Sequence, residues 1–145
     1  MKKKILFLIT IFFIQLSMLF GLQVYANEAE ISDEDMQNAV SAYKHGVDLV
    51  RTKAYDSAIA SFKKALEYYP QMTDAYYNIA SIYVTQKKYD EAYNTYVKII
   101  ALNPYDYDSI LQAAKISYNR KNYSLAMKYL KYIPDDYEYY GLVQQ

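Results

Sequence analysis

The fold is most clearly predicted by residues 76–104, YYNIASIYVTQKKYDEAYNTYVKIIALNP. Two apolar runs with helical spacing lie on either side of the polar break at residues 86–88. Ala80 in the first run and Ala92 in the second are small, so the two helices can approach closely. Pro104 ends the second helix, because proline lacks an amide proton and clashes with the preceding turn. The stretch therefore predicts a pair of packed helices.

The same pattern recurs along the chain at an offset of 34 residues, which aligns Pro70 with Pro104. A fixed period of this length is typical of stacked supersecondary units. Similar polar breaks recur at residues 52–54 and 120–122. The aligned columns are small, aromatic or large apolar: Gly46, Ala80 and Ala114; Tyr55, Tyr89 and Tyr123; Ala58, Ala92 and Ala126; and Phe62, Tyr96 and Leu130.

The second repeat resembles the tetratricopeptide repeat, in which large, small and aromatic residues follow one another at fixed spacing before a proline. The resemblance extends over residues 39–133. It implies an all-α solenoid of antiparallel helix pairs, but says little about function, since the family is a scaffold used for many partners. The residues that carry it in the second repeat are Tyr76, Ile79, Ala80, Tyr83, Ala92, Tyr96 and Pro104.

The repeats divide the chain into a lead-in segment at 27–38, a repeat domain at 39–134 (39–72, 73–106 and 107–134) and a C-terminal cap at 135–145. Ser32 and Asp35 resemble a capping box, so we expect extra helix before the first repeat. Pro134 comes four residues early in the third repeat, which predicts a second helix shortened by about one turn. Asp135 and Asp136 then favour a short capping helix, because acids stabilise the positive end of a helix dipole.

Residues 1–26 have the pattern of a secretion signal: lysines at positions 2–4, an apolar run at 5–22, and Val24-Tyr25-Ala26 before the cut. We therefore predict cleavage after Ala26 and an exported, bacterial-type protein that is periplasmic, secreted or associated with the cell envelope. The alternative is an uncleaved N-terminal membrane anchor, since the apolar run is close to the lower length for crossing a bilayer. The sequence has no cysteine, which excludes disulfides and a cysteine-linked lipid.

Charge and residue types argue against several function classes. Without the three lysines of residues 1–26, 13 of the 16 basic residues remain against 16 acidic ones, so no basic surface for nucleic acid is expected. His45 is the only histidine, and we expect it at the edge of the core rather than as a metal ligand. The acidic pairs near the prolines resemble helix caps: Asp106 with Asp108, and Asp135 with Asp136. We expect no catalytic residues, no metal and no cofactor, hence no enzyme.

The first helix of each repeat carries two stripes, which are rows of residues at i, i+4 and i+7 on one side of the helix. One is expected to pack inside the repeat: Ala42, Gly46 and Leu49; Tyr76, Ala80 and Tyr83; and Ile110, Ala114 and Ser117. The other is offset by one residue, and by resemblance to the family it lines a concave partner-binding groove. With Asn78, its members are Tyr43, Val47, Val50, Tyr77, Ser81, Val84, Leu111, Lys115 and Tyr118. Alternatively, this second stripe packs against residues 31–40.

The groove predicts the kind of partner. Some family members hold a C-terminal carboxylate with Lys, Asn and Arg side chains, and of the corresponding residues only Asn78 fits; the others are Tyr43, Val47, Asp108 and Gln112. The apolar, aromatic lining favours an amphipathic helix or an extended hydrophobic peptide. We predict that the second stripe contributes to binding and little to folding, with Tyr77 as its central residue, whereas Tyr83 belongs to the core.

The sequence therefore predicts a protein-interaction adaptor or scaffold outside the cytoplasm. A membrane-anchored version of the same module and an accessory subunit of an enzyme complex are the alternatives. Homo-oligomerisation is left open.

Overall fold

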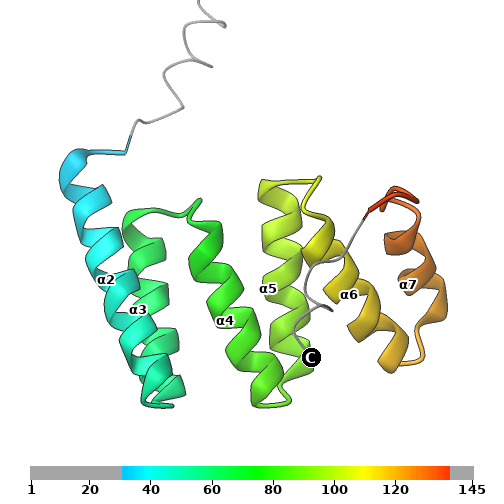
Figure 1. The fold of residues 1–145 in the computed structure, drawn as a ribbon, viewed down its shortest axis with the longest axis horizontal. Helices are drawn as coiled ribbons and strands as arrows, with labels where there is room; N and C mark the ends of the chain where they lie inside the picture. The colour runs from blue at the N-terminus through cyan, green and yellow to red at the C-terminus, as the bar shows by residue number, and fades with distance from the viewer. Residues whose placement is uncertain (1–30, 138–145) are drawn as a thin grey trace, which may run out of the picture. The chain divides into compact units, whose positions relative to one another are not determined.

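A computed structural model describes residues 31–137, and this part of the chain is all-α (Figure 1). The helices stand side by side in chain order and alternate in direction, so that each packs against the next. They form the pairs α2 and α3, α4 and α5, and α6 and α7. Their bounds are α2 Asp33–Arg51, α3 Tyr55–Tyr68, α4 Thr73–Thr85, α5 Tyr89–Leu102, α6 Tyr107–Asn119 and α7 Tyr123–Leu130.

The turn inside each pair has one geometry, repeated three times. Lys53, Lys87 and Lys121 have φ angles of 61°, 58° and 62°, in the left-handed region that glycine usually occupies. The amide of the next residue donates to a carbonyl five residues back, as from Ala54 to Leu49 at 2.9 Å. This is the Schellman arrangement that closes a helix C-terminus. The predicted polar breaks are therefore tight turns.

The core consists of two clusters, and each joins the two helices of one repeat to the first helix of the next. The first cluster holds Ala58, Ile59 and Phe62 of α3 with Ala75, Ile79 and Ile82 of α4, and α2 packs on it. The second holds Ala80 of α4, three residues of α5, and Ala113 and Ile116 of α6: the α5 residues are Ala92, Tyr96 and Ile99. The apolar face of one repeat is thus covered by the repeat that follows.

The repeat boundaries and the helix ends coincide closely. α4 begins at Thr73 and α6 at Tyr107, the first residues of the second and third sequence repeats. α2 begins at Asp33, so it adds helix ahead of residue 39. α7 has 8 residues whereas α3 and α5 have 14 each, as the early position of Pro134 predicts.

The expectation for His45 is wrong, because this side chain is exposed. His45 occupies the column of Ile79 and Ala113, which are buried against the preceding repeat. Within residues 31–137 no repeat precedes the first one, so nothing there covers the same position.

The predicted secretion signal, residues 27–30 of the lead-in segment and most of the C-terminal cap lie outside the described residues. Among residues 31–137, no helix is both long enough and apolar enough to cross a membrane.

Candidate partner-binding surface

We call the ten residues of the predicted groove the groove face, and all of them lie on the first helices of the repeats, α2, α4 and α6. Four members are exposed and the other six are half-buried. The exposed members are Ser81, Val84, Lys115 and Tyr118, and the half-buried ones are Tyr43, Val47, Val50, Tyr77, Asn78 and Leu111.

The part of the groove face on α2 packs into the core. Tyr43, Val47 and Val50 all lie against the first cluster, to which α4 also contributes. The Tyr43 ring is tilted against Phe62 with 5.5 Å between centroids, and its hydroxyl accepts a hydrogen bond from Asn78 Nδ2 at 3.1 Å. The first contact lies within the repeat and the second joins it to the next repeat, so the expectation that the stripe contributes little to folding is wrong for Tyr43.

Tyr77 is also part of the structure rather than a free anchor. Its hydroxyl donates to Asp106, and its ring meets Tyr96 edge to face with 6.4 Å between centroids. Asp106 caps α6 by accepting from the Ser109 amide at 2.9 Å, as predicted for this acid. Burial, the hydrogen bond and the charge of Asp106 raise the pKa of Tyr77 well above the usual 10.0. The prediction that Tyr77 matters little for folding is therefore wrong, and Tyr83 packs against both clusters as expected.

The exposed part of the groove face lies on α4 and α6. Val84 is 37% exposed and Tyr118 is 62% exposed, next to the polar Ser81 and Lys115. Exposure increases from the first repeat to the third, since each repeat covers the one before it. Apolar side chains left accessible in this way are typical of interaction surfaces.

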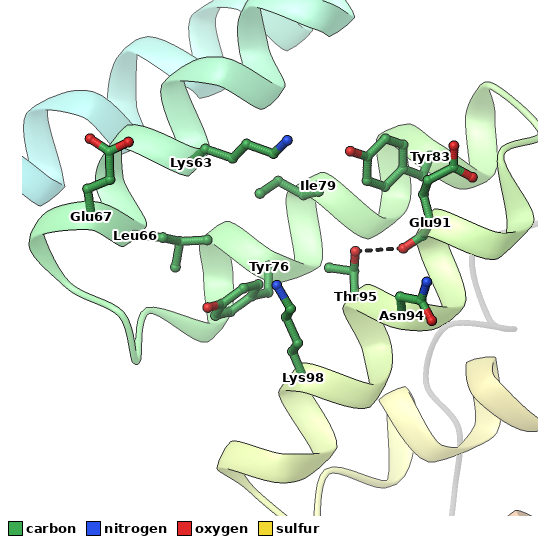
Figure 2. A pocket seen from close by; sticks show the side chains of 10 residues that line it. All are labelled: Lys63, Leu66, Glu67, Tyr76, Ile79, Tyr83, Glu91, Asn94, Thr95 and Lys98. Atoms are coloured by element: carbon green, nitrogen blue, oxygen red, sulfur yellow. Dashed lines mark hydrogen bonds between the residues drawn. The ribbon is translucent and has the colours of Figure 1, made fainter.

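A hollow of about 480 Å³ opens on the opposite side of α4, between α3 and α5 (Figure 2). Two lysines and two glutamates line it, so its formal charges balance. Lys98 Nζ lies 5.9 Å from the centroid of the Tyr76 ring, and the Thr95 hydroxyl donates to the Glu91 carbonyl at 2.7 Å. The sequence did not predict this hollow, which is lined by Lys63, Leu66, Glu67, Tyr76, Ile79, Tyr83, Glu91, Asn94, Thr95 and Lys98.

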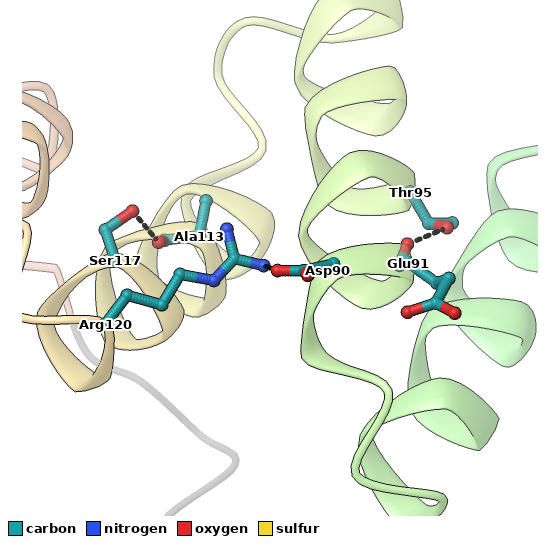
Figure 3. A network of polar contacts seen from close by, with 6 residues as sticks. All are labelled: Asp90, Glu91, Thr95, Ala113, Ser117 and Arg120. Carbon is teal, nitrogen blue, oxygen red and sulfur yellow. Dashed lines mark hydrogen bonds and ion pairs between the residues drawn. The ribbon is translucent and has the colours of Figure 1, made fainter.

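A polar contact between repeats, which the sequence did not predict, joins α5 and α6 (Figure 3). Arg120, at the end of α6, pairs with Asp90 at the start of α5, and its guanidinium lies 5.0 Å from the centroid of the Tyr93 ring. One repeat earlier, Gln86 donates to Asp56 at 3.2 Å. The 34-residue offset relates these two pairs, and it is the signal by which they could have been found.

The hydroxyls in the same region are engaged by their own helices. Ser117 is buried and donates to the Ala113 carbonyl at 2.7 Å, as Thr95 does to Glu91 (Figure 3). Neither has a histidine beside it to act as a base, since the one histidine is on α2. In the described part of the chain, no group of three or more His, Cys, Asp or Glu side chains is placed to hold a metal.

Comparison with known proteins agrees with this architecture. Residues 49–101 match the family model described as tetratricopeptide repeat, whereas no curated protein matches the sequence. Among solved structures, the N-terminal domain of stress-induced protein-1 (STI-1) from C. elegans superposes with a TM-score of 0.64 at 22% identity, over 72% of this chain and 91% of that one.

Two further solved structures show the same fold. The crystal structure of MamA gives a TM-score of 0.61 at 22% identity over 66% of this chain, and the match spans only 56% of the MamA chain. The second TPR of Spaghetti (RPAP3), bound to the HSP90 peptide SRMEEVD, gives 0.59 at 17% identity over 68% of this chain and 92% of that one. The protein therefore has the all-α tetratricopeptide-repeat fold, and its central segment at 49–101 matches the tetratricopeptide-repeat family.

Proposed function

We propose that this protein is a non-catalytic interaction adaptor that binds a peptide or helix of another protein on its groove face. The observation that carries the proposal is the exposed row on α4 and α6, where Val84 and Tyr118 stand beside Ser81 and Lys115. The fold supports it, since the Spaghetti domain of the same fold was solved with a bound peptide.

The chemistry of the groove face favours an apolar partner segment. Lys115 is its one charged member, and Asn78, the only residue that fits a carboxylate clamp, already donates to Tyr43 and to the Asp74 carbonyl. A partner that relied on a terminal carboxylate would find a single lysine. An amphipathic helix or an extended peptide with apolar side chains matches the exposed row better.

The place of action in this proposal is outside the cytoplasm, after removal of residues 1–26. The basic start, the apolar run and Val24-Tyr25-Ala26 support it. Mass spectrometry of protein from exporting cells should find an N-terminus at Asn27. Recovery of only the full-length chain, in the membrane fraction, would favour the membrane-anchored alternative.

The groove assignment is tested by photocrosslinking from two exposed positions. Ser81 lies in the middle of the groove face, whereas Lys64 lies on α3, outside it. A photoreactive residue at position 81 should trap a discrete partner, and the same residue at position 64 should not. Equal crosslinking from both positions, or from position 64 alone, would refute the groove assignment.

A substitution that blocks the groove face gives a second test of where the partner binds. Ser81→Arg puts a long side chain across the groove at an exposed site, so its effect on unfolding should stay within about 0.5 kcal/mol. Capture of the crosslinked partner should fall by roughly tenfold or more, and Lys64→Arg should leave it unchanged. Normal capture by Ser81→Arg, with a normal melting curve, would show that the partner binds elsewhere.

A further inference from the structure

The hollow between α3, α4 and α5 has the size and the lining of a small-molecule site. Its volume of about 480 Å³ lies within the range of about 300–1,000 Å³ that is usual for ligand pockets. Part of its wall is apolar, since it is made by Ile79, which is buried, and by the half-buried Leu66, Tyr76 and Tyr83. None of its lining residues belongs to the groove face, so the hollow is separate from the proposed partner-binding surface.

The charged side chains of the hollow are not evenly placed. Lys63 of α3 and Lys98 of α5 direct their ammonium groups toward its middle, whereas the two glutamates, Glu67 and Glu91, stand at its ends (Figure 2). Lys98 Nζ is close enough to the Tyr76 ring, at 5.9 Å from its centroid, for a cation–π contact. Among residues 31–137, neither lysine has an ion pair. The middle of the hollow is therefore positively charged, although its formal charges balance overall.

The two lysines are not part of the repeat pattern. At the offset of 34 residues, Val97 takes the place of Lys63. Tyr132 takes the place of Lys98 at the same offset. The next interface between repeats therefore has no lysine at either position, and packing of the solenoid does not require one.

The hollow itself depends on a small residue at one position. Tyr129 of α7 takes the place of Thr95 one repeat later. The Tyr129 ring packs edge to face on Tyr93 of α5 with 6.3 Å between centroids, and the two hydroxyls lie 2.9 Å apart. Thr95 therefore leaves open a space that an aromatic ring fills in the next interface.

From these observations we infer that the hollow binds a small carboxylic acid with an apolar body. The carboxylate lies between Lys63 and Lys98, whose ammonium groups donate charge-assisted hydrogen bonds to it. The apolar body lies against Ile79 and the Tyr76 ring, where it is removed from water. The volume, which is that of a small-molecule pocket, favours a free acid over a segment of another protein.

Phenylbutyrate is a suitable probe, because it joins one carboxylate to an apolar body, and phenylbutanol has the same body without the charge. Titration of the full chain, followed by the amide signals in NMR spectra, should give saturable shifts centred on Ile79 and Thr95 for the acid. The alcohol should bind at least about tenfold more weakly, since it cannot accept a charge-assisted hydrogen bond.

Two substitutions test the lysines. Lys63→Met and Lys98→Met each keep an unbranched side chain and remove the charge, and both positions are exposed, so the variants should melt like the wild type. Each should weaken binding of the acid by about fivefold or more. Lys64→Met is the matched control, because Lys64 has the place of Lys98 in the first repeat but lies outside the hollow. This control should bind the acid normally.

Thr95→Tyr copies the residue of the next interface and should abolish binding by filling the hollow. If circular dichroism shows that this variant is unfolded, the two lysine variants decide the result. Ser81→Arg, which blocks the groove face, should leave binding of the acid unchanged. Failure of this inference and failure of the proposed function can therefore be told apart.

Four outcomes would overturn the inference: no saturable binding of the acid, equal binding of the acid and the alcohol, a loss in Lys64→Met as large as in Lys63→Met, or shifts centred on the groove face. A dipeptide of phenylalanine and glutamate with both ends blocked gives a further check. If this dipeptide binds and phenylbutyrate does not, the hollow belongs to a protein segment and the small-molecule assignment is wrong.

Discussion

Gly46→Ala should destabilise the first repeat, although the same column holds alanine in the other two. A Cβ added to Gly46 would lie 2.6 Å from Cε1 and 2.8 Å from Cδ1 of Phe62. The Phe62 ring is fully buried and rests against Tyr43, so it cannot swing away cheaply. Overpacking of this kind costs about 1–3 kcal/mol. Alanine regains about 1 kcal/mol of helix propensity. Because both contacts are far shorter than van der Waals distance, we expect the overpacking cost to lie in the upper part of this range, about 2–3 kcal/mol. The net loss should then be about 1–2 kcal/mol.

Urea denaturation followed by circular dichroism measures this loss, and a double-mutant cycle tests its cause. The third repeat pairs Ala114 with Leu130 at the corresponding positions, so Phe62→Leu should create the space that Gly46→Ala needs. Phe62→Leu alone should cost about 1–2 kcal/mol through lost apolar burial. The double variant should be more stable than the sum of the two changes by about 1 kcal/mol or more. A stabilising Gly46→Ala, or additive effects in the cycle, would refute the steric argument.

Ala92→Asp should abolish cooperative unfolding, because it buries an unpaired carboxylate at a fully buried position, at a cost of several kcal/mol. A wild-type melting curve for this variant would contradict the assigned repeat register. Lys87→Gly should raise the free energy of unfolding by about 1 kcal/mol, because it removes the strain of a non-glycine residue in the left-handed conformation. The control Lys88→Gly, at a φ of −85°, should not raise it. Equal shifts in melting temperature for the two variants would argue against this explanation. Tyr77→Phe should cost about 1 kcal/mol at neutral pH through the lost hydrogen bond to Asp106. Since the pKa of Tyr77 is raised in the folded protein, its contribution is present below pH 10 and is lost as the pH rises above it. Wild-type stability should then fall more steeply above pH 10 than that of Tyr77→Phe, and parallel curves would contradict the assignment.

The helices and their pairing could be predicted from residue types at fixed spacing. The columns of Gly46 and Ala58 mark close helix contact, and Pro70 and Pro104 mark helix ends, whichever partner the helices find. Asp106 was identifiable as a cap because capping depends on residues within a few positions of one another. The left-handed lysines were not identifiable, since lysine has no preference for that conformation and the turn imposes it.

The candidate site could be predicted only in part. Helical periodicity placed the groove face on one side of each first helix, but periodicity cannot say what lies above that side. Tyr43 and Tyr77 are packed by the next repeat, whereas Ser81 and Tyr118 are exposed. The hollow between α3 and α5 and the Arg120–Asp90 pair also depend on helices that belong to different repeats.

Residue spacing alone was enough to predict a stack of helix pairs with a fixed period, the ends of each pair, and the shortening of the third pair. These features depend on contacts within about 34 residues, which the repeat makes visible. The packed helices were needed to show which side of each repeat is buried by its successor: within residues 31–137, His45 of the first repeat is exposed and an apolar cavity lies between α6 and α7. Burial in a solenoid depends on the neighbouring repeat, so two positions of the same column differ in exposure when only one of them is covered by a neighbour.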